Sequence, residues 1–439
     1  MTPSARIAAT VALLAEVAAA PRRPADATAN SFFRERRYIG SGDRRAVAER
    51  AWGVLRQRIR LEWHLAAGGV PATPRLLVMA HLLLVERWTR EGVLQAFCGG
   101  RFNPAPPDPG ELSVIEALAG APLVDEEMPE GPRHNLPDWA LPGFKARFGA
   151  ALEEAMAAME QPAPLDLRAN LLRTTREAAA AALAAEGIAT EPMPFSPWGL
   201  RIADRRPILA SKAYTDGLVE IQDEGSQLIA LLTGARPGMR VVDYCAGAAG
   251  KTLAVAATMG NRGRIIACDV SATRLEGAVK RLRRAGVDNA ERHFLQPGDR
   301  WVKRRAGQFD RVLVDAPCTG TGTWRRNPDA RSRTQARDLE ELVTKQREIL
   351  ETVAELVRPG GRLVYATCSV LPEENGSQVE AFLARHGEYE AVPVAEAWGE
   401  AFAPANPPGP PPCDGRWMEL APHSHGTDGF FAAVLRRKE

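Results

Sequence analysis

Two cysteines of this chain each follow a short β-branched run and could act together as nucleophiles. Cys318 comes directly after residues 314–317, and Cys368 comes directly after residues 364–367. A cysteine thiolate is an intrinsically strong nucleophile that forms covalent intermediates. A single cysteine at the end of a strand is more often a buried structural residue. The matched placement of two, with Asp315 shortly before the first, favours one shared chemical site.

A parallel sheet must position the two runs if both thiols are to reach one pocket. From about residue 210 onward, strand-like and helix-like segments alternate, which predicts a mostly parallel, doubly wound α/β sheet. Ligands of such sheets gather at the carboxyl ends of the strands, and neighbouring strands lie about 4.8 Å apart. If the strands before Cys318 and Cys368 are adjacent, both sulfur atoms can contact one small planar substrate.

A turn rich in small residues follows the first strand of this alternation and indicates a cofactor site. The strand is expected over residues 239–243 and the turn over residues 244–252. Small side chains there let backbone N–H groups at a helix start approach a ligand, although the turn matches neither GxxxxGK[ST] nor GxGxxG. The next strand ends at Asp269, which could hold ribose hydroxyl groups or cap the following helix. Together these features predict a nucleoside-containing cofactor.

The composition is that of an ordinary protein of a reducing compartment. The 439 residues are 45% hydrophobic and 25% charged, with a formal net charge of +2, which suits two or three domains. The six cysteines form no CxxC pair, so we expect free thiols and a cytoplasmic protein. No run of about 18 apolar residues occurs, and we expect no membrane contact. The spacing of Cys413, His423 and His425 fits no zinc pattern, so no metal is expected.

Arginine is concentrated in two stretches of the chain. One runs from Arg300 to Arg337 and the other from Arg34 to Arg60. Arginine pairs well with phosphate, and such clusters near a candidate site favour a phosphate-bearing substrate. A solvated charged face is the alternative interpretation.

Several ordered segments carry motifs of one known family. They are residues 243–252, 310–329 and 366–375, with further similarity at 167–170, 222–226 and 427–431. These segments resemble the Sun/RsmB family of RNA 5-methylcytosine methyltransferases, which use S-adenosylmethionine. The family usually has Cys-Ala-Ala-Pro-Gly-Gly-Lys where this chain has residues 245–251, so Ala249 replaces a glycine. If that position needs a positive φ, the strain is about 1 to 2 kcal/mol.

The resemblance implies a chain of three parts. Residues 1–135 resemble the NusB-like RNA-binding domain of bacterial members that modify 16S ribosomal RNA, and their apolar residues recur at helical spacing. An all-α domain is therefore expected there, followed by a small α/β connecting subdomain over residues 136–210. Residues 211–439 are expected to form a Rossmann-like class I methyltransferase domain with a mostly parallel, doubly wound sheet.

The resemblance also assigns roles to individual residues. Cys368 is the implied nucleophile and Cys318 the residue that releases the product, although spacing alone does not order the two. The residues implied to bind S-adenosyl-L-methionine are Cys245, Ala246, Gly247, Ala248, Ala249, Gly250, Lys251, Asp269, Asp299 and Asp315. The residues implied to bind RNA are Arg168, Asn170, Arg325, Arg326 and Asn327.

Methylation of cytosine at C5 explains why two thiols and a carboxyl group stand together. C5 is a poor nucleophile, and addition of a thiolate at C6 turns the ring into an enamine that is reactive at C5. Asp315 is placed to supply a proton or hydrogen bond at N3 during the addition. A base must then remove the C5 proton so that the thiol can leave, which gives the second cysteine a task.

We therefore expect an RNA cytosine-C5 methyltransferase that acts on 16S ribosomal RNA before or during subunit assembly. A monomer is expected, with RNA and not DNA as its partner. One alternative is methylation of transfer RNA by the same catalytic residues. Another is a ribosome-assembly or RNA-binding factor in which the altered turn has impaired catalysis. Retention of Asp315, Cys318, Thr367 and Cys368 favours the enzyme.

Overall fold

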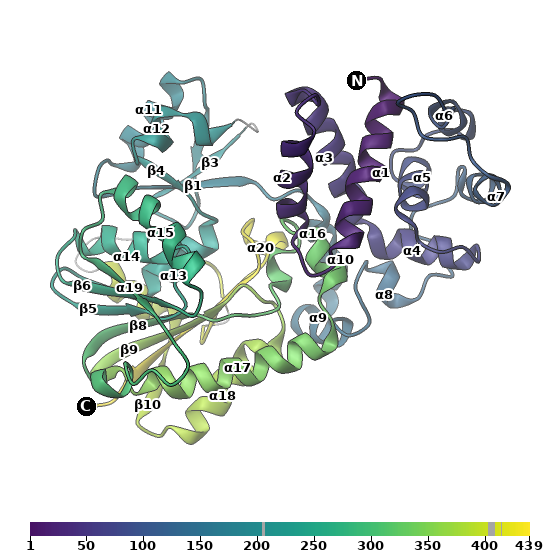
Figure 1. Ribbon diagram of the computed structural model, residues 1–439. Helices are drawn as coiled ribbons and strands as arrows, with labels where there is room; N and C mark the ends of the chain where they lie inside the picture. Colours follow the sequence, from purple (N-terminus) through teal and green to yellow (C-terminus); the bar gives the residue numbers. More distant parts are fainter. Residues whose placement is uncertain (204–206, 403–408, 414) are drawn as a thin grey trace. The chain divides into compact units, whose positions relative to one another are not determined.

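The computed structural model describes residues 1–203, 207–402, 409–413 and 415–439. The chain forms two compact units (Figure 1). The first comprises residues 1–145, 149–160 and 324–336, and the second comprises residues 146–148, 161–323 and 337–439. Among the described residues, none of the helices combines the length and apolar character that a membrane span needs.

The first unit consists of helices around one apolar core. Its helices are α1 (Pro3–Ala19), α2 (Ala25–Glu35), α3 (Ser41–Arg56), α4 (Arg58–Ala67), α5 (Pro74–Leu84), α6 (Arg90–Ala96), α7 (Pro109–Leu118), α8 (Glu130–Arg133), α10 (Leu152–Glu160) and α16 (Pro328–Arg333), and α9 (Leu141–Phe148) has residues in both units. The Thr73 hydroxyl accepts a hydrogen bond from the Leu76 N–H and so caps α5. Every residue of α5 from Leu76 to Leu84 is buried, and α1, α3, α4 and α7 pack around it.

The helical unit includes more of the chain than the expected boundary at residue 135. Glu160, at the end of α10, forms an ion pair with Arg60 at 2.8 Å, and both side chains are largely buried. Residues 324–336 also belong to the unit. Trp324 is buried there, stacked on Phe144 with ring centroids 5.5 Å apart and edge-on to Trp139 at 6.2 Å. The buried contacts of these residues with the helices explain the difference.

The second unit contains a small antiparallel sheet in the order β2-β3-β1-β4. Its elements are β1 (Leu165–Ala169), β2 (Thr190–Pro192), β3 (Gly199–Ile202), β4 (Val219–Ile221), α11 (Arg176–Ala185) and α12 (Lys212–Thr215). Leu167, Leu183 and Leu200 lie in its core. Because β4 pairs with β1, the sheet continues beyond the expected subdomain end at residue 210.

A larger, eight-stranded sheet forms the main layer of the second unit, in the order β10-β12-β9-β8-β5-β6-β7, with β11 paired to β12. Its strands are β5 (Arg240–Asp243), β6 (Arg264–Asp269), β7 (Ala290–Phe294), β8 (Phe309–Asp315), β9 (Val357–Thr367), β10 (Tyr389–Val392), β11 (Met418–Leu420) and β12 (Phe430–Arg437). The strands from β9 to β7 are parallel, whereas β10, β11 and β12 pair antiparallel.

Helices cover both faces of this sheet (Figure 1). They are α13 (Glu224–Leu232), α14 (Gly250–Met259), α15 (Ala272–Ala285), α17 (Ala336–Ala354), α18 (Gly376–Arg385) and α19 (Val394–Phe402). The short helix α20 (Pro422–His425) precedes β12. Side chains of a strand alternate between the two faces. Val314 and Tyr365 thus pack with Leu350 of α17, whereas Leu313 and Val364 pack with α13 and α19. The predicted doubly wound, Rossmann-like architecture is confirmed.

The register of the parallel strands brings the candidate residues to one edge of the sheet. Asp315 of β8 pairs with Ala366 of β9, and Asp243 of β5 pairs with both Leu313 and Ala267. The carboxyl ends of β5, β6, β8 and β9 therefore lie together, where open α/β sheets bind their ligands.

Candidate active site

Cys318 and Cys368 lie side by side beyond the ends of β8 and β9, with their Sγ atoms 3.4 Å apart. The structure therefore brings together the two thiols that the sequence singles out. Gly320 adopts a φ of 69°, and a Cβ atom there would lie 4.0 Å from the Cys368 sulfur. A left-handed conformation favours glycine, and this glycine lets the loop after Cys318 pass close to Cys368.

The two thiols are electrostatically coupled. A hydrogen bond with Cys368, burial, and the charge of Glu374 raise the pKa of Cys318 well above its ordinary range. Cys318 therefore stays protonated near neutral pH. A protonated Cys318 can donate its hydrogen bond to the Cys368 sulfur and so stabilise a thiolate there.

Asp315 and Lys251 form an ion pair at the same edge, with Nζ 2.6 Å from Oδ2. Burial opposes the charge of Lys251, but the charge and hydrogen bond of Asp315 outweigh it and raise the lysine's pKa. Asp315 remains about one-third exposed. The Lys251 ammonium thus stabilises the Asp315 carboxylate, and the exposed part of this carboxylate can still contact a substrate.

Two residues of the turn between β5 and α14 have the left-handed backbone conformation that the small side chains of this turn suggest. Gly247 has a φ of 54° and Ala249, at the N-cap of α14, has a φ of 63°. Asp269 accepts hydrogen bonds from the Gly247 N–H at 2.8 Å and the Ser271 N–H at 2.7 Å. The helix cap of α15 is Ser271 and not Asp269. Asp269 therefore fixes the turn, and the strained Ala249 is accommodated in it.

A cavity of about 490 Å³ lies next to Asp269. Its lining includes Tyr244, Val270, Phe294, Leu295, Pro297 and Asp299. Val270 and Phe294 are 64% and 40% exposed although they are apolar. Exposed apolar faces beside the carboxylates of Asp299 and Glu355 suit an adenine ring, which needs stacking surfaces and a hydrogen-bond acceptor for its amino group.

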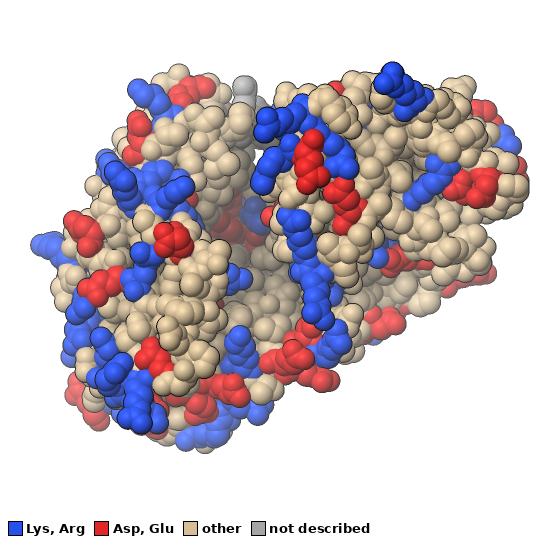
Figure 2. Space-filling model, viewed as in Figure 1, with Lys and Arg blue, Asp and Glu red and all other residues tan. Residues whose placement is uncertain are grey.

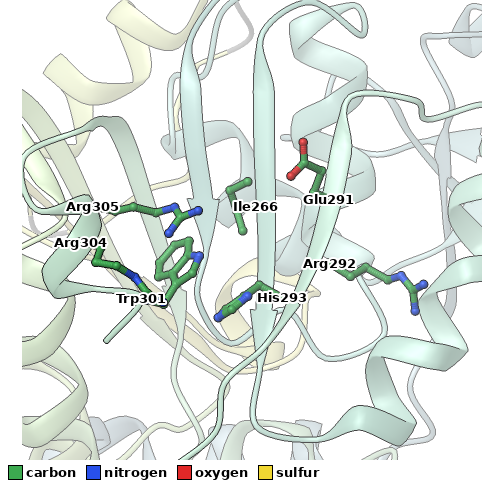
Figure 3. Close-up of a pocket in the computed structure, with 7 residues that line it drawn as sticks. All are labelled: Ile266, Glu291, Arg292, His293, Trp301, Arg304 and Arg305. Atoms are coloured by element: carbon green, nitrogen blue, oxygen red, sulfur yellow. The ribbon is translucent and has the colours of Figure 1, made fainter. Parts of the chain in front are cut away.

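Asp299 is held in place by a neighbouring cluster, whose residues His293 and Trp301 are drawn in Figure 3. Its carboxylate contacts His293 Nε2 at 2.7 Å and accepts the Trp301 N–H at 2.8 Å. His293 stacks on Trp301 with centroids 5.0 Å apart, and the Arg305 guanidinium lies over the indole at 4.8 Å from its centroid. These residues line a second cavity of about 470 Å³ over Ile266. The hydrogen bond with His293 lowers the pKa of Asp299 and keeps it an acceptor.

Cys245 and Cys268 lie near the turn but are poor candidates for a nucleophile. Burial raises the pKa of each thiol far above its ordinary range, and nearby carboxylates add to the effect. Both therefore stay protonated. Cys245 lies in the turn between β5 and α14, directly after Tyr244, and its contact with a cofactor stays a prediction.

Arg168 and Asn170 are buried, which corrects the expectation that they bind RNA. The Arg168 Nε donates to Gln222 Oε1 at 2.7 Å, and burial lowers the pKa of Arg168 to about 10. Asn170 donates to the carbonyl oxygens of Gly217 and Ala285, each at 2.8 Å. These side chains hold the small sheet together and tie it to α15, so neither presents a polar group to a ligand.

The segment expected to face RNA also differs from the prediction. Arg325 is buried, and its carbonyl accepts a hydrogen bond from Arg56 at 3.3 Å within the helical unit. Burial of the preceding Trp324 draws Arg325 into the protein interior. Arg326 is half-buried and Asn327 is exposed, so for these two residues RNA contact stays a prediction.

Arginines gather on one face of the helical unit, over α2 and α3, with a few acidic side chains between them (Figure 2). A groove there is lined by Asn30, Phe33, Arg34, Arg37 and Arg44. The other arginine-rich stretch is divided, because residues 324–336 belong to the helical unit and residues 300–323 to the second unit.

Two further functional candidates, Glu374 and Asn375, were not predicted from the sequence, although they lie within the motif at residues 366–375. Glu374 and Asn375 are buried behind the cysteine loops and bond to them. The only available signal was an acidic and an amide residue shortly after an apolar strand, which is also common in exposed loops.

The sheet and the site together define a class of protein. A mostly parallel, doubly wound sheet carries a nucleoside-sized cavity and a reactive centre at the carboxyl ends of adjacent strands. This is the arrangement of a Rossmann-like methyltransferase.

Comparison with known proteins agrees with that class. The family model "16S rRNA methyltransferase RsmB/F" matches residues 230–436, and the ferredoxin-like domain of RsmF/B-like proteins matches residues 136–209. A ribosomal RNA small subunit methyltransferase B of Klebsiella pneumoniae is 32% identical over 91% of each chain. A probable counterpart from Synechocystis is 33% identical over 72% of this chain and 70% of its own. A methyltransferase homologue from Pyrococcus horikoshii has a TM-score of 0.59 and 29% identity, covering 70% of this chain and 96% of its own.

The chain belongs to the RsmB/F family of 16S rRNA methyltransferases. Its cofactor is S-adenosyl-L-methionine, and the residues present fit that molecule. Asp269 accepts the Gly247 N–H of the turn and directly precedes Val270, which lines the cavity, so it can hold the ribose. Asp299 lines the cavity together with its apolar residues, so it can meet the adenine. Lys251, at the first turn of α14, offers a cation for the methionine carboxylate.

Proposed function

We propose that this protein methylates C5 of a cytosine in 16S ribosomal RNA through a covalent bond between Cys368 and C6. The observation that carries the proposal is the pair of thiols 3.4 Å apart beside Asp315. One thiol is enough to form an adduct, and the second gives the site a base for its release. The relatives named ribosomal RNA small subunit methyltransferase B support 16S ribosomal RNA as the substrate.

In the attack step, Cys318 donates a hydrogen bond that stabilises the Cys368 thiolate. The Cys368 sulfur bonds to C6, and the electron pair of the C5–C6 double bond is delocalised toward C5 and N3. N3 takes up a proton from the Lys251 ammonium through the Asp315 carboxyl group, to which the ammonium is hydrogen-bonded at 2.6 Å. Bound S-adenosyl-L-methionine supplies an electrophilic methyl group to C5.

In the release step, Cys318 acts as the base. Once the Cys368 sulfur is bonded to carbon, its hydrogen bond with Cys318, the largest cause of the raised Cys318 pKa, is lost. Cys318 then gives its proton to solvent and becomes a thiolate. It takes the C5 proton, the electron pair re-forms the C5–C6 double bond, and Cys368 leaves as a thiolate. The proton on N3 returns through Asp315 to Lys251, so the net products besides methylated RNA are the demethylated cofactor and the one proton that Cys318 released.

We also propose that the protein works as a monomer in the cytoplasm, on RNA before or during subunit assembly, and the chemistry supports this compartment and this timing. Two adjacent thiols must stay reduced, and the cytoplasm keeps thiols reduced. A target base must also leave its stack to reach a site at the sheet edge, which is easier before an RNA is packed into a subunit.

Single substitutions of the two cysteines test the proposal. We expect Cys368→Ala to abolish transfer of labelled methyl groups to RNA, because the adduct cannot form. We expect Cys318→Ala to accumulate an RNA adduct that resists denaturant, because the C5 proton cannot be removed. Cys98→Ala, at an exposed thiol far from β8 and β9 in sequence, is the matched control. Adduct formation by Cys368→Ala and not by Cys318→Ala would invert the two roles.

The substrate is tested by bisulfite sequencing of ribosomal and transfer RNA from cells that lack the protein. Loss of one protected cytosine in 16S ribosomal RNA is the expected result. Loss of a protected cytosine from a transfer RNA instead would change the proposed substrate but not the proposed chemistry. Failure of the purified protein to bind S-adenosyl-L-methionine in calorimetry would favour an assembly factor.

A further inference from the structure

Glu374 has a fully buried carboxylate that the reaction above does not use. It ends the 3₁₀ turn η5 (Pro372–Glu374), and its backbone carbonyl accepts a hydrogen bond from Tyr365 Oη at 2.7 Å. Tyr365 is buried on β9, so the turn is fixed to the sheet. A buried carboxylate persists only where donors surround it. The donors here come from the loop that carries Cys318 and from α17.

Both neighbours of Cys318 are held through Glu374. Thr319 donates its backbone N–H to Oε1 at 2.8 Å and its hydroxyl to Oε2 at 2.5 Å. The buried amide of Gln346, on α17, donates to Oε1 at 3.0 Å and to the carbonyl oxygen of Pro317 at 2.9 Å. The loop is thus fixed immediately before and after the Cys318 thiol.

Both neighbours of Cys368 are held by the next residue along the chain. Asn375 accepts a hydrogen bond from the Thr367 hydroxyl at 2.5 Å and donates to the carbonyl oxygen of Ser369 at 2.9 Å. Asn375 is also buried. Two consecutive residues therefore hold the two cysteine loops, Glu374 mainly the Cys318 loop and Asn375 the Cys368 loop. The loops also bond to each other, because the Gly322 N–H donates to the Cys368 carbonyl at 3.0 Å and the Val370 N–H to the Thr321 hydroxyl at 3.0 Å.

We infer that Glu374 and Asn375 are positioning residues with separate tasks, Glu374 for the release step and Asn375 for the attack step. Glu374 sets where the Cys318 sulfur lies relative to the C5 proton, and Asn375 sets where the Cys368 sulfur lies relative to C6. This inference rests on the function proposed above. Displacement of a reacting group by about 1 Å can slow a step by about a hundredfold, so loosening either loop affects its own step first.

Glu374→Gln and Asn375→Asp are the informative substitutions because each keeps the side-chain volume. In Glu374→Gln an amide donor faces the donors of Thr319, and in Asn375→Asp the donor to the Ser369 carbonyl is lost. With RNA and labelled S-adenosyl-L-methionine, we expect Glu374→Gln to slow release about tenfold and to accumulate the denaturant-resistant adduct. We expect Asn375→Asp to slow adduct formation about tenfold without accumulation. KM values for RNA and cofactor should stay within about twofold in both variants.

Glu373→Gln, at the exposed neighbour of Glu374, is the matched control and should behave as the natural chain does. If Glu374→Gln does not fold, Thr319→Val removes a single hydroxyl bond to the carboxylate and should still accumulate the adduct. Equal slowing of both steps, or a loss of thermal stability without a change in the partition between them, would reduce the pair to a structural role. Absence of any adduct in Cys318→Ala would instead refute the proposed function itself.

Discussion

Three carboxylates near the cofactor turn have different electrostatic surroundings. Asp315 is paired with Lys251, and Asp269 accepts two backbone N–H groups. Asp243 is buried and accepts a hydrogen bond from the Thr252 hydroxyl at 2.7 Å. Burial is the largest influence on Asp243 and raises its pKa to about 6. Of the three, Asp243 is the residue whose charge is least compensated near neutral pH.

Replacement of Asp243 by asparagine should stabilise the protein in a pH-dependent manner. The pKa of Asp243 is about 6 when folded against an ordinary value of 3.8, so the folded state binds the proton more tightly. The stability that this proton binding gives the folded protein is fully present below the ordinary pKa and is lost as the pH rises through the pKa of the folded state. Asp243→Asn removes the buried charge and keeps an acceptor for Thr252. The free energy of unfolding should rise by about 2 to 3 kcal/mol near pH 7.5 and about half as much near pH 5.

Urea denaturation at the two pH values measures this difference. Asp288→Asn is the control, because Asp288 is exposed and should leave the free energy of unfolding unchanged at both. An equal gain at both pH values for Asp243→Asn would mean that burial of the charge is not the cause.

At the scale of elements, the start of α14 depends on a non-glycine residue in the left-handed region. Relief of the strain at Ala249 by glycine is worth about 1 to 2 kcal/mol. Loss of the buried methyl group costs about 0.8 kcal/mol, and the greater freedom of glycine in the unfolded chain costs about 0.5 to 1 kcal/mol. These contributions nearly cancel, which explains how alanine can replace the family's glycine without loss of the turn.

Ala249→Gly should therefore change the free energy of unfolding by less than about 1 kcal/mol. Ala254→Gly is a matched comparison, since Ala254 is buried in the interior of the same helix. It offers no strain to relieve and should lower stability by about 1 to 2 kcal/mol. Chemical denaturation of both variants checks the pair, and similar losses would show that Ala249 is not strained.

Strand patterns predicted much of the site, and side-chain contacts between distant segments account for the rest. The β-branched runs before Cys318 and Cys368 located two strands, and the rule that ligands gather at strand ends placed the thiols together. The roles of Glu374 and Asn375 depend on a turn that packs against both cysteine loops. The spacing of residues within one segment does not reveal such a contact. The burial of Arg325 likewise follows from the partners of Trp324, which are distant in sequence.

At the scale of the whole chain, the helical unit includes a segment that interrupts the methyltransferase unit. Residues 324–336 leave the second unit after Thr323, shortly after Cys318, and the chain returns at Arg337. Within the helical unit, Asp329 accepts the Ala25 N–H at 3.1 Å, and Trp139 donates its indole N–H to the Thr334 carbonyl at 3.1 Å. The chain that follows the Cys318 loop is therefore part of the helical unit from Trp324 onward.

Trp324→Ala should separate cofactor binding from methyl transfer. Removal of a buried tryptophan stacked on Phe144 should destabilise the helical unit by about 3 to 5 kcal/mol and release the chain that follows the Cys318 loop. The cofactor turn and Asp269 belong to the second unit, so the Kd for S-adenosyl-L-methionine in calorimetry should change by less than about twofold, while methyl transfer falls about tenfold or more. Phe102→Ala, at an exposed ring of the same unit, should leave both unchanged. Full methyl transfer by a Trp324→Ala protein with a destabilised helical unit would mean that the catalytic loop is held by the second unit alone.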